Sequence, residues 1–386
     1  MKKTGILTFH YSNNYGGVLQ TAALYNTVKN LGYDVEVIHY IPSNYTPVTK
    51  IKYLNLVKNE VKKILKGKTD FHRLAGIPKK ISIIKKHGGN IDQKFSEFRT
   101  EAMRMSRQVD ESSLPSLLSD YETVIVGSDQ VWNPSQRTKP EYFLDYGEAF
   151  KGQKISYAAD STVKEIDEKL SDSLKKSLDE FNYISVRNEH SFEFVKSVTG
   201  KETDIVADPT LLADFQTNEN GENGDYIFAY IIGKEISGTH SKAIDRIKKT
   251  TGDLPVYSIK IPDMQTEPSD FADKTMYDVG PQEWIDLIKN AKFIYTDSFH
   301  GVLFSLKYQK PFLAYYTEKM RATRFVDLGK RYQVDRYIVN SVEEIGEKGS
   351  VDTPPDYAGI NLLLEEHRKY SLKRLEDALN GLCSVQ

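Results

Sequence analysis

Residues 293–311 read FIYTDSFHGVLFSLKYQKP, and this stretch shows how the chain builds its fold. Its first four residues are β-branched or aromatic and predict a buried strand, and the apolar pattern that follows predicts a helix. Asp297 or Ser298 can cap the first turn of that helix, whose N–H groups favour a phosphate or a carboxylate. His300 and Gly301 lie in the same turn, and an imidazole can donate a hydrogen bond or move a proton near neutral pH. The stretch therefore predicts a strand–helix unit with a candidate anion site, and a structural histidine at a capped join is the alternative.

Strand-like runs alternate with helical patterns through most of the 386 residues, which predicts parallel sheets built from βαβ units. The expected strands are Gly5 to His10, Val35 to Tyr40, Thr123 to Ser128, Lys154 to Ala159, Tyr183 to Arg187, Asp204 to Ala207, Tyr226 to Ile232, Pro255 to Ile259, Phe293 to Thr296 and Pro311 to Tyr315. We therefore expect an α/β protein with two doubly wound domains, at residues 1–165 and 180–355, and a C-terminal helix at 356–386 that crosses back onto the first domain. Ligands of such sheets bind at the carboxyl ends of the strands, so the cleft between the domains is the expected site.

The composition is that of a globular protein with a large core, with 39% hydrophobic and 27% charged residues. Lys and Arg number 52 against 54 Asp and Glu, so no overall charge favours nucleic acid. No stretch approaches the roughly 20 apolar residues of a membrane span, and the N-terminus lacks a signal sequence, so a cytoplasmic location is expected. Cys383 is the one cysteine of the chain, which excludes an internal disulfide. The histidines show no HxH or HExxH spacing, so no metal site is expected.

Residues 50–107 interrupt the βαβ rhythm with helical patterns that contain 16 Lys or Arg and 5 Asp or Glu. The excess of 11 positive charges predicts a basic helical insert. Such a segment can lie on an anionic membrane surface or meet an anionic acceptor, and a solvated lysine-rich face is the alternative.

Two polar loops follow expected strands in the first half of the chain. In the first, YSNNYGG at 11–17, Gly16 and Gly17 let the backbone approach a ligand, and Asn14 is one of several polar groups suited to a sugar. In the second, VIVGSDQVWNP at 124–134, Asp129 is a candidate base for a hydroxyl, beside Gln130 and Trp132, whose indole can stack on a sugar ring. A steric glycine turn, a capping aspartate and a core tryptophan are the alternatives.

Two arginines are candidates for binding anions, because guanidinium groups bind phosphate and carboxylate in bidentate fashion. Arg187 follows a strand in SVRNE, and Arg324 lies in TEKMRATRF. Asp208 ends another strand in VADPTLL, where a turn or cap role is an alternative to contact with substrate.

Taken in order, six motifs between about Gly5 and Arg336 resemble those of the polysaccharide pyruvyl transferase family. They are NNYGGVLQTAAL, VIVGSDQVWNP, ISVRNEHS, VADPTLL, TDSFHGVLFSL with KPFL, and RATRFVDL. The resemblance implies two Rossmann-like domains arranged as in the GT-B glycosyltransferases, with the acceptor on the N-terminal side and the donor on the C-terminal side. In place of the GNxGD loop of better-known members, this chain has NNYGG.

The resemblance also implies a reaction. Phosphoenolpyruvate (PEP) would be the donor and co-substrate, with no further cofactor, and the product would be a pyruvate ketal. The acceptor would be a sugar of a surface polysaccharide, such as an exopolysaccharide or capsule, or of its lipid-linked precursor, with possible work at the inner face of the membrane. The family's PEP-binding histidine and arginine correspond by motif position to His300 and Arg187.

We therefore expect His300 and Asp129 to be the catalytic residues, with His300 at the donor and Asp129 at the acceptor hydroxyl. The residues expected to bind the donor are Arg187, Ser298, His300, Gly301 and Arg324. The residues expected to bind the acceptor are Asn14, Gly16, Gly17, Gln130 and Trp132. Two alternatives stay open, a GT-B glycosyltransferase that uses a nucleotide sugar and a non-catalytic glycan-binding homologue.

Overall fold

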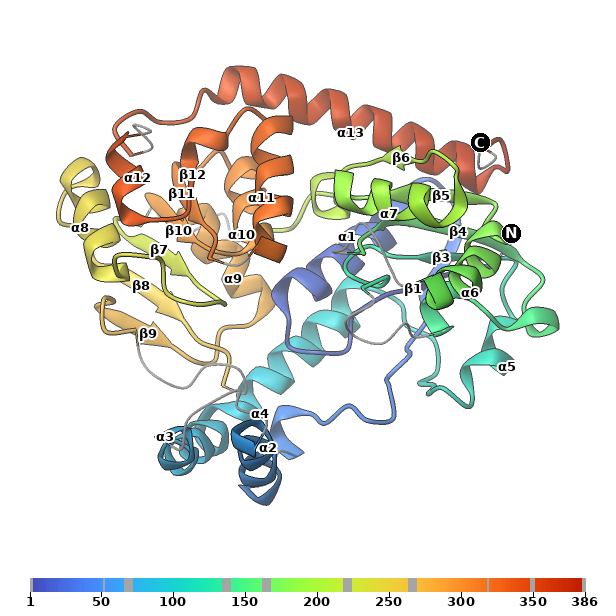
Figure 1. The fold of residues 1–386 in the computed structure, drawn as a ribbon, viewed down its shortest axis with the longest axis horizontal. Coiled ribbons are helices and arrows are strands. Elements are labelled where there is room, and N and C mark those ends of the chain that lie inside the picture. Colours follow the sequence, from blue (N-terminus) through green and yellow to red (C-terminus); the bar gives the residue numbers. More distant parts are fainter. Residues whose placement is uncertain are drawn as a thin grey trace.

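The chain folds into two parallel β-sheets that lie side by side, each flanked by helices (Figure 1). A computed structural model describes residues 3–50, 53–65, 72–133, 140–161, 168–217, 224–262, 269–317, 319–347 and 351–383. Both sheets have six strands. Parallel strands need crossover connections, and the helices that make them cover both faces of each sheet.

The first sheet has the strand order β2-β1-β3-β4-β5-β6. Its central strands are short apolar runs, as expected for strands that are covered on both faces; β3, for example, reads TVIV and is buried throughout. The strands are β1 (Lys3–Leu7), β2 (Asp34–Val37), β3 (Thr123–Val126), β4 (Gln153–Ala159), β5 (Tyr183–Val186) and β6 (Asp204–Ile205).

The second sheet has the order β12-β11-β10-β7-β8-β9, which is the Rossmann order when its strands are counted from β7. The strands are β7 (Ile227–Tyr230), β8 (Val256–Ile259), β9 (Lys274–Met276), β10 (Phe293–Thr296), β11 (Phe312–Tyr315) and β12 (Ile338–Val339). The sequence did not predict β9 and β12, because edge strands of two or three residues are too short to show a periodic pattern.

The helices include the crossovers between strands and the long C-terminal helix. They are α1 (Tyr15–Asn30), α2 (Tyr53–Leu65), α3 (His72–Ala75), α4 (Ile77–Ala102), α5 (Leu114–Leu118), α6 (Glu168–Asp179), α7 (Glu189–Thr199), α8 (His240–Thr251), α9 (Pro281–Asn290), α10 (Phe299–Lys307), α11 (Lys319–Arg331), α12 (Val342–Glu347) and α13 (Tyr357–Leu379). In the parts of the chain that the structure describes, no helix combines the length and the apolarity that crossing a bilayer requires.

The boundary between the domains lies later in the chain than the sequence predicted. Strand β5 pairs with β4, and β6 pairs with β5, so both belong to the first sheet. The N-terminal domain therefore continues to about residue 206 instead of ending at 165, and the second sheet begins with β7 at Ile227 instead of near 180. Successive βαβ units have the same sequence pattern on both sides of a boundary, so the pattern does not reveal which sheet a strand joins.

Each sheet has a topological switch point, where the chain reverses the direction in which it adds strands. In the first sheet this point lies between β1 and β3, because the chain adds β2 on one side of β1 and β3 on the other. In the second sheet it lies between β7 and β10. A crevice opens at the carboxyl ends of the strands at such a point, so these four strand ends are the places to search for a site.

Tyr15, the first residue of α1, anchors the N-terminal domain in the C-terminal one. Its ring stacks on Trp284 of α9, with centroids 5.6 Å apart, and meets the ring of Tyr230 edge to face at 5.8 Å. Its hydroxyl donates to the carbonyl of Val279 at 2.7 Å. Tyr15 and Trp284 are almost completely buried and belong to one apolar core that extends through both domains. Aromatic pairs of this kind contribute about 0.5–1.5 kcal/mol beyond their buried area.

Helix α13 crosses back from the second sheet to the first (Figure 1). At its start, the hydroxyl of Tyr357 donates to the carbonyl of Lys310 beside β11. Further along, the backbone N–H of Ala207 donates to Ser371 Oγ at 2.8 Å, and Gln153 Nε2 donates to the carbonyl of Ala378 at 2.8 Å. The predicted crossing helix is therefore present, and residues 384–386 lie outside the described part of the chain.

The basic insert forms α2, α3 and α4, and its longest helix braces the two domains. Ile91 and Phe95 of α4 are buried in the shared core. Lys94 Nζ donates to both carboxylate oxygens of Glu283 on α9, at 2.7 and 2.8 Å. Only the outer part of the insert, α2, α3 and the start of α4, projects from the body of the molecule (Figure 1).

Buried histidines predict that the protein loses stability in mild acid. Burial lowers the pKa of His10 to about 3 and the pKa values of His240 and His367 to about 4, from 6.5. Below pH 6.5 the unfolded chain therefore binds more protons than the folded one, and stability falls as pH falls. We expect a loss of roughly 2 kcal/mol for each of these histidines between pH 7 and pH 5, measured by urea unfolding.

The matched variant is His10→Asn, which cannot take up that proton. Its stability should depend less steeply on pH than that of the unchanged protein, whatever its absolute stability. Equal slopes in the two proteins would contradict the assignment to His10.

Candidate active site

Charged side chains follow four neighbouring strands of the first sheet and meet in one cluster. Asp129 follows β3, Asp160 follows β4, Arg187 follows β5, and Asp208 lies three residues after β6. Arg187 is at the centre. Its Nη1 donates to Asp208 Oδ2 at 2.9 Å, and its Nη2 donates to Asp160 Oδ2 at 2.7 Å and lies 3.4 Å from Asp129 Oδ1. We call these four residues the charge cluster.

Arg187 and Asp208 stay ionised although both are buried. Burial would lower the pKa of the Arg187 guanidinium, but Asp160, Asp208 and Asp129 raise that pKa above its usual value. Burial would likewise raise the pKa of Asp208, but the charges of His300 and Arg187 hold it well below its usual range. Three carboxylates surround one guanidinium, so the cluster has a formal excess of negative charge next to His300.

His300 comes to the charge cluster from the other domain. It lies in the first turn of α10, whose N-cap Ser298 accepts a hydrogen bond from the backbone N–H of Gly301 at 3.3 Å. The imidazole Nε2 lies 3.6 Å from Asp208 Oδ2, which is an ion-pair distance but too long for a hydrogen bond. The side chain is 11% exposed, so the ring is held in place and still reaches the solvent.

Gly16 of α1 allows this approach of the two domains. A Cβ atom at Gly16 would lie 2.1 Å from His300 Nδ1 and 2.5 Å from Cε1. No real side chain tolerates such distances, so the imidazole occupies the space that any other residue would fill. His300 is thereby held between the backbone of α1 and the carboxylate of Asp208.

A cavity of about 140 Å³ lies beside His300, where the two switch points face each other. Its lining comes from the ends of β1, β3, β7 and β10 and from α11: Asn14, Gly16, Asp129, Gln130, Tyr230, Ile232, Asp297, Ser298, Phe299, His300, Arg324 and Phe325. The N-termini of α1 and α10 both reach this cavity. Each helix start attracts an anion, so two of them at one cavity, with His300 and Arg324, favour a negatively charged ligand.

Polar contacts hold the rim of the cavity in place. Arg324 donates from Nη1 and Nη2 to the amide oxygen of Gln130 at 2.5 and 3.1 Å, which ties α11 to the loop after β3. Asp297 accepts the backbone N–H groups of Ile232 and Gly233, each at 2.7 Å. These bonds connect the ends of β7 and β10 at the switch point of the second sheet.

The cavity thus brings together seven residues that the sequence singled out from different parts of the chain: Asn14, Gly16, Asp129, Gln130, Ser298, His300 and Arg324. Of these, Asn14, Gly16 and Asp129 belong to the first domain, and Ser298 and His300 belong to the second.

Four other expected residues lie outside the cavity lining. Trp132 is fully buried, stacks on Phe143, and donates its indole N–H to a backbone carbonyl, so the core alternative holds and it is not available to a sugar. Gly17 and Gly301 make room for close packing, because a Cβ atom would lie 2.9 Å from the carbonyl of Phe9 and 2.4 Å from Thr296 Oγ1, respectively.

Arg187, the fourth, lies behind the cavity, with its guanidinium 4.7 Å from the ring centre of Phe299. Its Nη atoms bond carboxylates of its own domain, so the direct grip on a donor that the resemblance implied is not what this arrangement offers. In the structure, Arg187 positions Asp208 and Asp129 instead.

Sequence reasoning missed Asp160 and left open a turn or cap role and contact with substrate for Asp208. Like Asp129, both are acidic residues that follow a strand of the first sheet within three residues. Asp208 does cap the turn, since Thr210 N–H donates to its Oδ1 at 3.0 Å, and its other oxygen faces Arg187 and His300. The cap role of Asp208 is thus confirmed, and its contact with a substrate stays a prediction.

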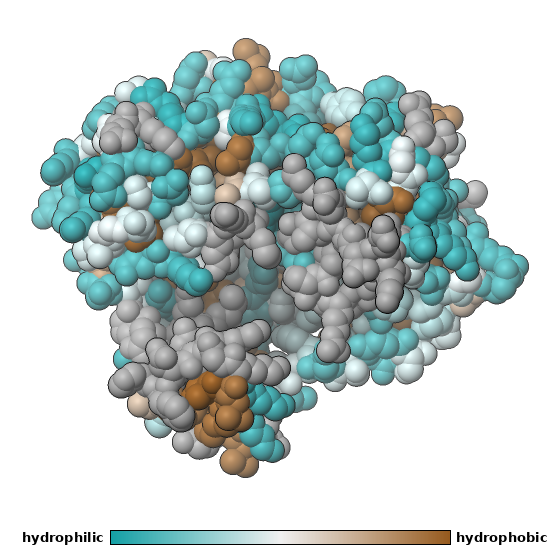
Figure 2. Space-filling view, viewed as in Figure 1, coloured by the Kyte–Doolittle hydropathy of each residue, from teal (hydrophilic) through white to brown (hydrophobic). Residues whose placement is uncertain are grey.

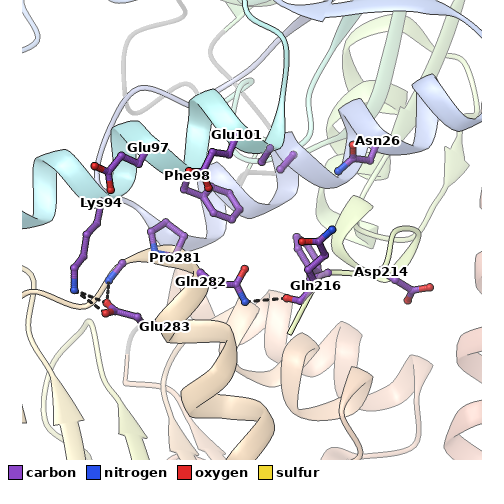
Figure 3. A pocket seen from close by; sticks show the side chains of 14 residues that line it. Asn26, Lys94, Glu97, Phe98, Glu101, Asp214, Gln216, Pro281, Gln282 and Glu283 are labelled. Carbon is purple, nitrogen blue, oxygen red and sulfur yellow. Dashed lines mark hydrogen bonds and ion pairs between the residues drawn. The ribbon is translucent and has the colours of Figure 1, made fainter. Parts of the chain in front are cut away.

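A larger cavity, of about 480 Å³, lies between α1, α4 and α9 (Figure 3). Carboxylates of Glu97, Glu101, Asp214 and Glu283 line it, and its one lysine, Lys94, is paired with Glu283. These carboxylates repel an anion. The larger cavity is therefore not the candidate anion site, although it exceeds the other in volume. Among the described residues, no group of three or more His, Cys, Asp or Glu is placed to hold a metal ion.

Solved structures that share this architecture include proteins crystallised with nucleotide sugars. The chain is similar to UGT89C1 of Arabidopsis thaliana, crystallised with UDP-L-rhamnose, at 12% identity and a TM-score of 0.52, over 99% of both chains. It is also similar to UGT71G1 of Medicago truncatula, crystallised with UDP-glucose, at 8% identity and a TM-score of 0.50, over 97% of this chain and 98% of that one. At these identities the likeness shows the fold alone, two Rossmann-like domains in the GT-B arrangement.

The amino-acid sequence shows to which family within this architecture the chain belongs. The model of the polysaccharide pyruvyl transferase family matches residues 14–319, which is most of the chain. The chain therefore belongs to that family, as the motifs indicated, and it is a transferase of polysaccharide metabolism. No curated protein sequence matches it significantly.

Removing one carboxylate of the charge cluster should destabilise the fold. We expect Asp208→Asn to lower the free energy of unfolding by about 1–3 kcal/mol at pH 7, because it weakens the charged hydrogen bond to the buried Arg187 Nη1. Asp214→Asn is the control, since that side chain is 99% exposed and its pair with Lys307 contributes little. Urea unfolding that shows equal stability for both variants would contradict a structural role for the cluster.

Filling the space at Gly16 should displace His300. We expect Gly16→Ala to cost about 1–3 kcal/mol of stability, as overpacking does, and to shift the NMR signals of the His300 imidazole. Gly89→Ala, on the open side of α4 with nothing within 4 Å of the new methyl group, should instead stabilise the protein by up to about 1 kcal/mol. Unchanged His300 signals in Gly16→Ala would show that the ring does not rest on α1.

Proposed function

We propose that the protein transfers the pyruvyl group of PEP to two hydroxyls of a sugar, in a surface polysaccharide or its lipid-linked precursor, and forms a pyruvate ketal. Membership of the family supports transfer to a polysaccharide. The single observation that supports PEP most strongly is the clamped His300 in a small cavity at the joined switch points. At about 140 Å³ that cavity is below the roughly 300–1,000 Å³ of drug-sized ligand pockets, so it suits a three-carbon phosphoester better than a nucleotide sugar.

The groups around the cavity match the charges of PEP, which carries a phosphate and a carboxylate. Arg324, whose Nη1 and Nη2 also donate to Gln130, supplies a positive charge beside one of these anions. The first turns of α1 and α10 supply backbone N–H groups and their partial positive charge. His300 adds a donor that becomes cationic when protonated. Because these groups come from both domains, the donor itself contributes to holding the domains together.

The reaction needs one proton delivered and two removed. Protonation of the PEP methylene carbon makes a methyl group and leaves cationic character on the central carbon. A sugar hydroxyl attacks that carbon and releases its proton. Phosphate then leaves with the oxygen that joined it to the central carbon, a second hydroxyl attacks, and its proton is also released. One released proton replaces the one consumed, and the other leaves with the phosphate, so atoms and charge balance.

The two candidate catalytic residues lie on opposite domains, as the reaction requires. His300, from the donor domain, binds the phosphate or carboxylate and assists proton transfer, and its Nε2 lies 3.6 Å from Asp208 Oδ2. Asp129, from the acceptor domain, orients the hydroxyl and accepts its proton. Arg187 lies between Asp129 and Asp208 and keeps both carboxylates in place. The charge cluster thus links the positions of the acid and the base.

Incubation with PEP and candidate glycans tests the proposal. We expect phosphate release together with a product that is heavier by one pyruvate less one water, measured by mass spectrometry. His300→Ala should lower the rate by at least about a hundredfold, the low end of acid–base contributions. The control is His87→Ala on α4, which removes an imidazole outside the cavity and should leave turnover nearly unchanged.

Two results would overturn the proposal. Turnover of a nucleotide sugar in the absence of any turnover of PEP would identify a glycosyltransferase. Full cellular function of His300→Ala would identify a glycan-binding protein without catalysis.

A further inference from the structure

Helix α2 presents an apolar stripe to the solvent. Leu54, Val61 and Leu65 are 66%, 38% and 81% exposed. At 100° per residue these three side chains lie within about 40° of one another around the helix axis, so they form a single line. Figure 2 shows hydrophobic residues gathered at the projecting end of the molecule, where Figure 1 labels α2. Most large apolar side chains of this protein are buried, so three exposed ones in line need a reason.

Positive charge lies beside this stripe. Residues 50–86 contain 12 Lys or Arg and 2 Asp or Glu, although the whole chain is nearly neutral. Lys58 and Lys62 lie along one edge of the stripe and are exposed. The start of α4, which packs beside α2, adds the exposed Lys79, Lys85 and Lys86. The rest of α4 is tied into the domain interface, so these exposed lysines lie at the projecting end.

We propose that α2 and the start of α4 dock the protein on an anionic lipid bilayer. The leucine and valine side chains enter the boundary between headgroups and acyl chains, and the lysines contact the lipid phosphates. This combination of an apolar line with flanking lysines is typical of helices that lie in a membrane interface. An acidic protein partner would explain the lysines but not the exposed line of leucines among them, and a second copy of α2 would bring the same positive charges together.

The docking surface connects with the candidate active site through α4. From Ile77 at the projecting end to Asp92, the helix rises by about 22 Å. Asp92 accepts a hydrogen bond from Asn13 at 2.6 Å, in the loop next to the cavity residue Asn14. A protein seated by α2 therefore holds its cavity some 20 Å from the lipid. This distance favours an acceptor sugar that is attached to a membrane lipid, a conclusion that rests on the proposed function.

Flotation of the full chain with vesicles tests the docking surface. We expect binding to vesicles of phosphatidylcholine mixed with phosphatidylglycerol and much weaker binding to phosphatidylcholine alone. Binding should disappear at about 1 M salt, where charges are screened beyond about 3 Å. Each lysine near an anionic surface is worth about fivefold in affinity, so the double variant Lys58→Gln, Lys62→Gln should bind about 25-fold more weakly.

The apolar stripe has its own variant and its own control. Leu65→Glu should abolish flotation. Leu362→Glu makes the same change on α13, where the leucine is 74% exposed, and should leave flotation unchanged. Melting curves of both variants establish that they are folded.

Three outcomes would overturn the inference: equal binding to neutral and anionic vesicles, undiminished binding of Leu65→Glu, or a dimer of the unchanged protein that Leu65→Glu dissociates. Activity on a water-soluble acceptor tests this inference and the proposed function separately. Leu65→Glu should convert such an acceptor as fast as the unchanged protein does. Flotation without any PEP turnover would contradict the proposed function alone, and PEP turnover without flotation would contradict the docking surface alone.

Discussion

The contact between the start of α1 and the C-terminal domain determines the geometry of everything around it. Tyr15 inserts its ring against Trp284 and fixes the helix start in the other domain. Gly16, the next residue, then lies directly under the imidazole of His300. Tyr15 and Gly16 thus act together. The ring of Tyr15 holds the domains at a fixed distance, and the missing side chain of Gly16 makes that distance possible. Asp129 and His300 share one cavity only because this contact sets the spacing.

Electrostatics imposes the second constraint. The buried carboxylates of Asp160 and Asp208 are stable only because the Arg187 guanidinium bonds both of them, and it also lies close to the partly exposed carboxylate of Asp129. The imidazole of His300 faces these carboxylates from the other domain, with its Nε2 3.6 Å from Asp208 Oδ2. The same carboxylates repel an anion that comes too near, which confines a negatively charged donor to the side of the cavity lined by Arg324 and the helix starts.

The sequence revealed the parts of the site that depend on local rules. A capping serine followed by histidine in a first helical turn identified Ser298 and His300, and polar residues after a buried strand identified Asp129 and Gln130. Two Rossmann-like domains also followed from alternating strands and helices. The predictions that failed depend on residues that lie far apart in the sequence. The indole of Trp132 looks the same in a sequence whether it packs in a core or stacks on a sugar, and the carboxylates around Arg187 come from strands that only the folded sheet brings together. The reason for Gly16 lies almost 300 residues away, at His300.

The route of α13 has a mechanical consequence. The chain passes between the domains once after β6 and again through this helix, whose two ends are bonded to different sheets. A pair of covalent crossings permits rotation about a line through both and resists twist or separation. Together with the core that both domains share, these two crossings keep Gly16 in place under the imidazole of His300.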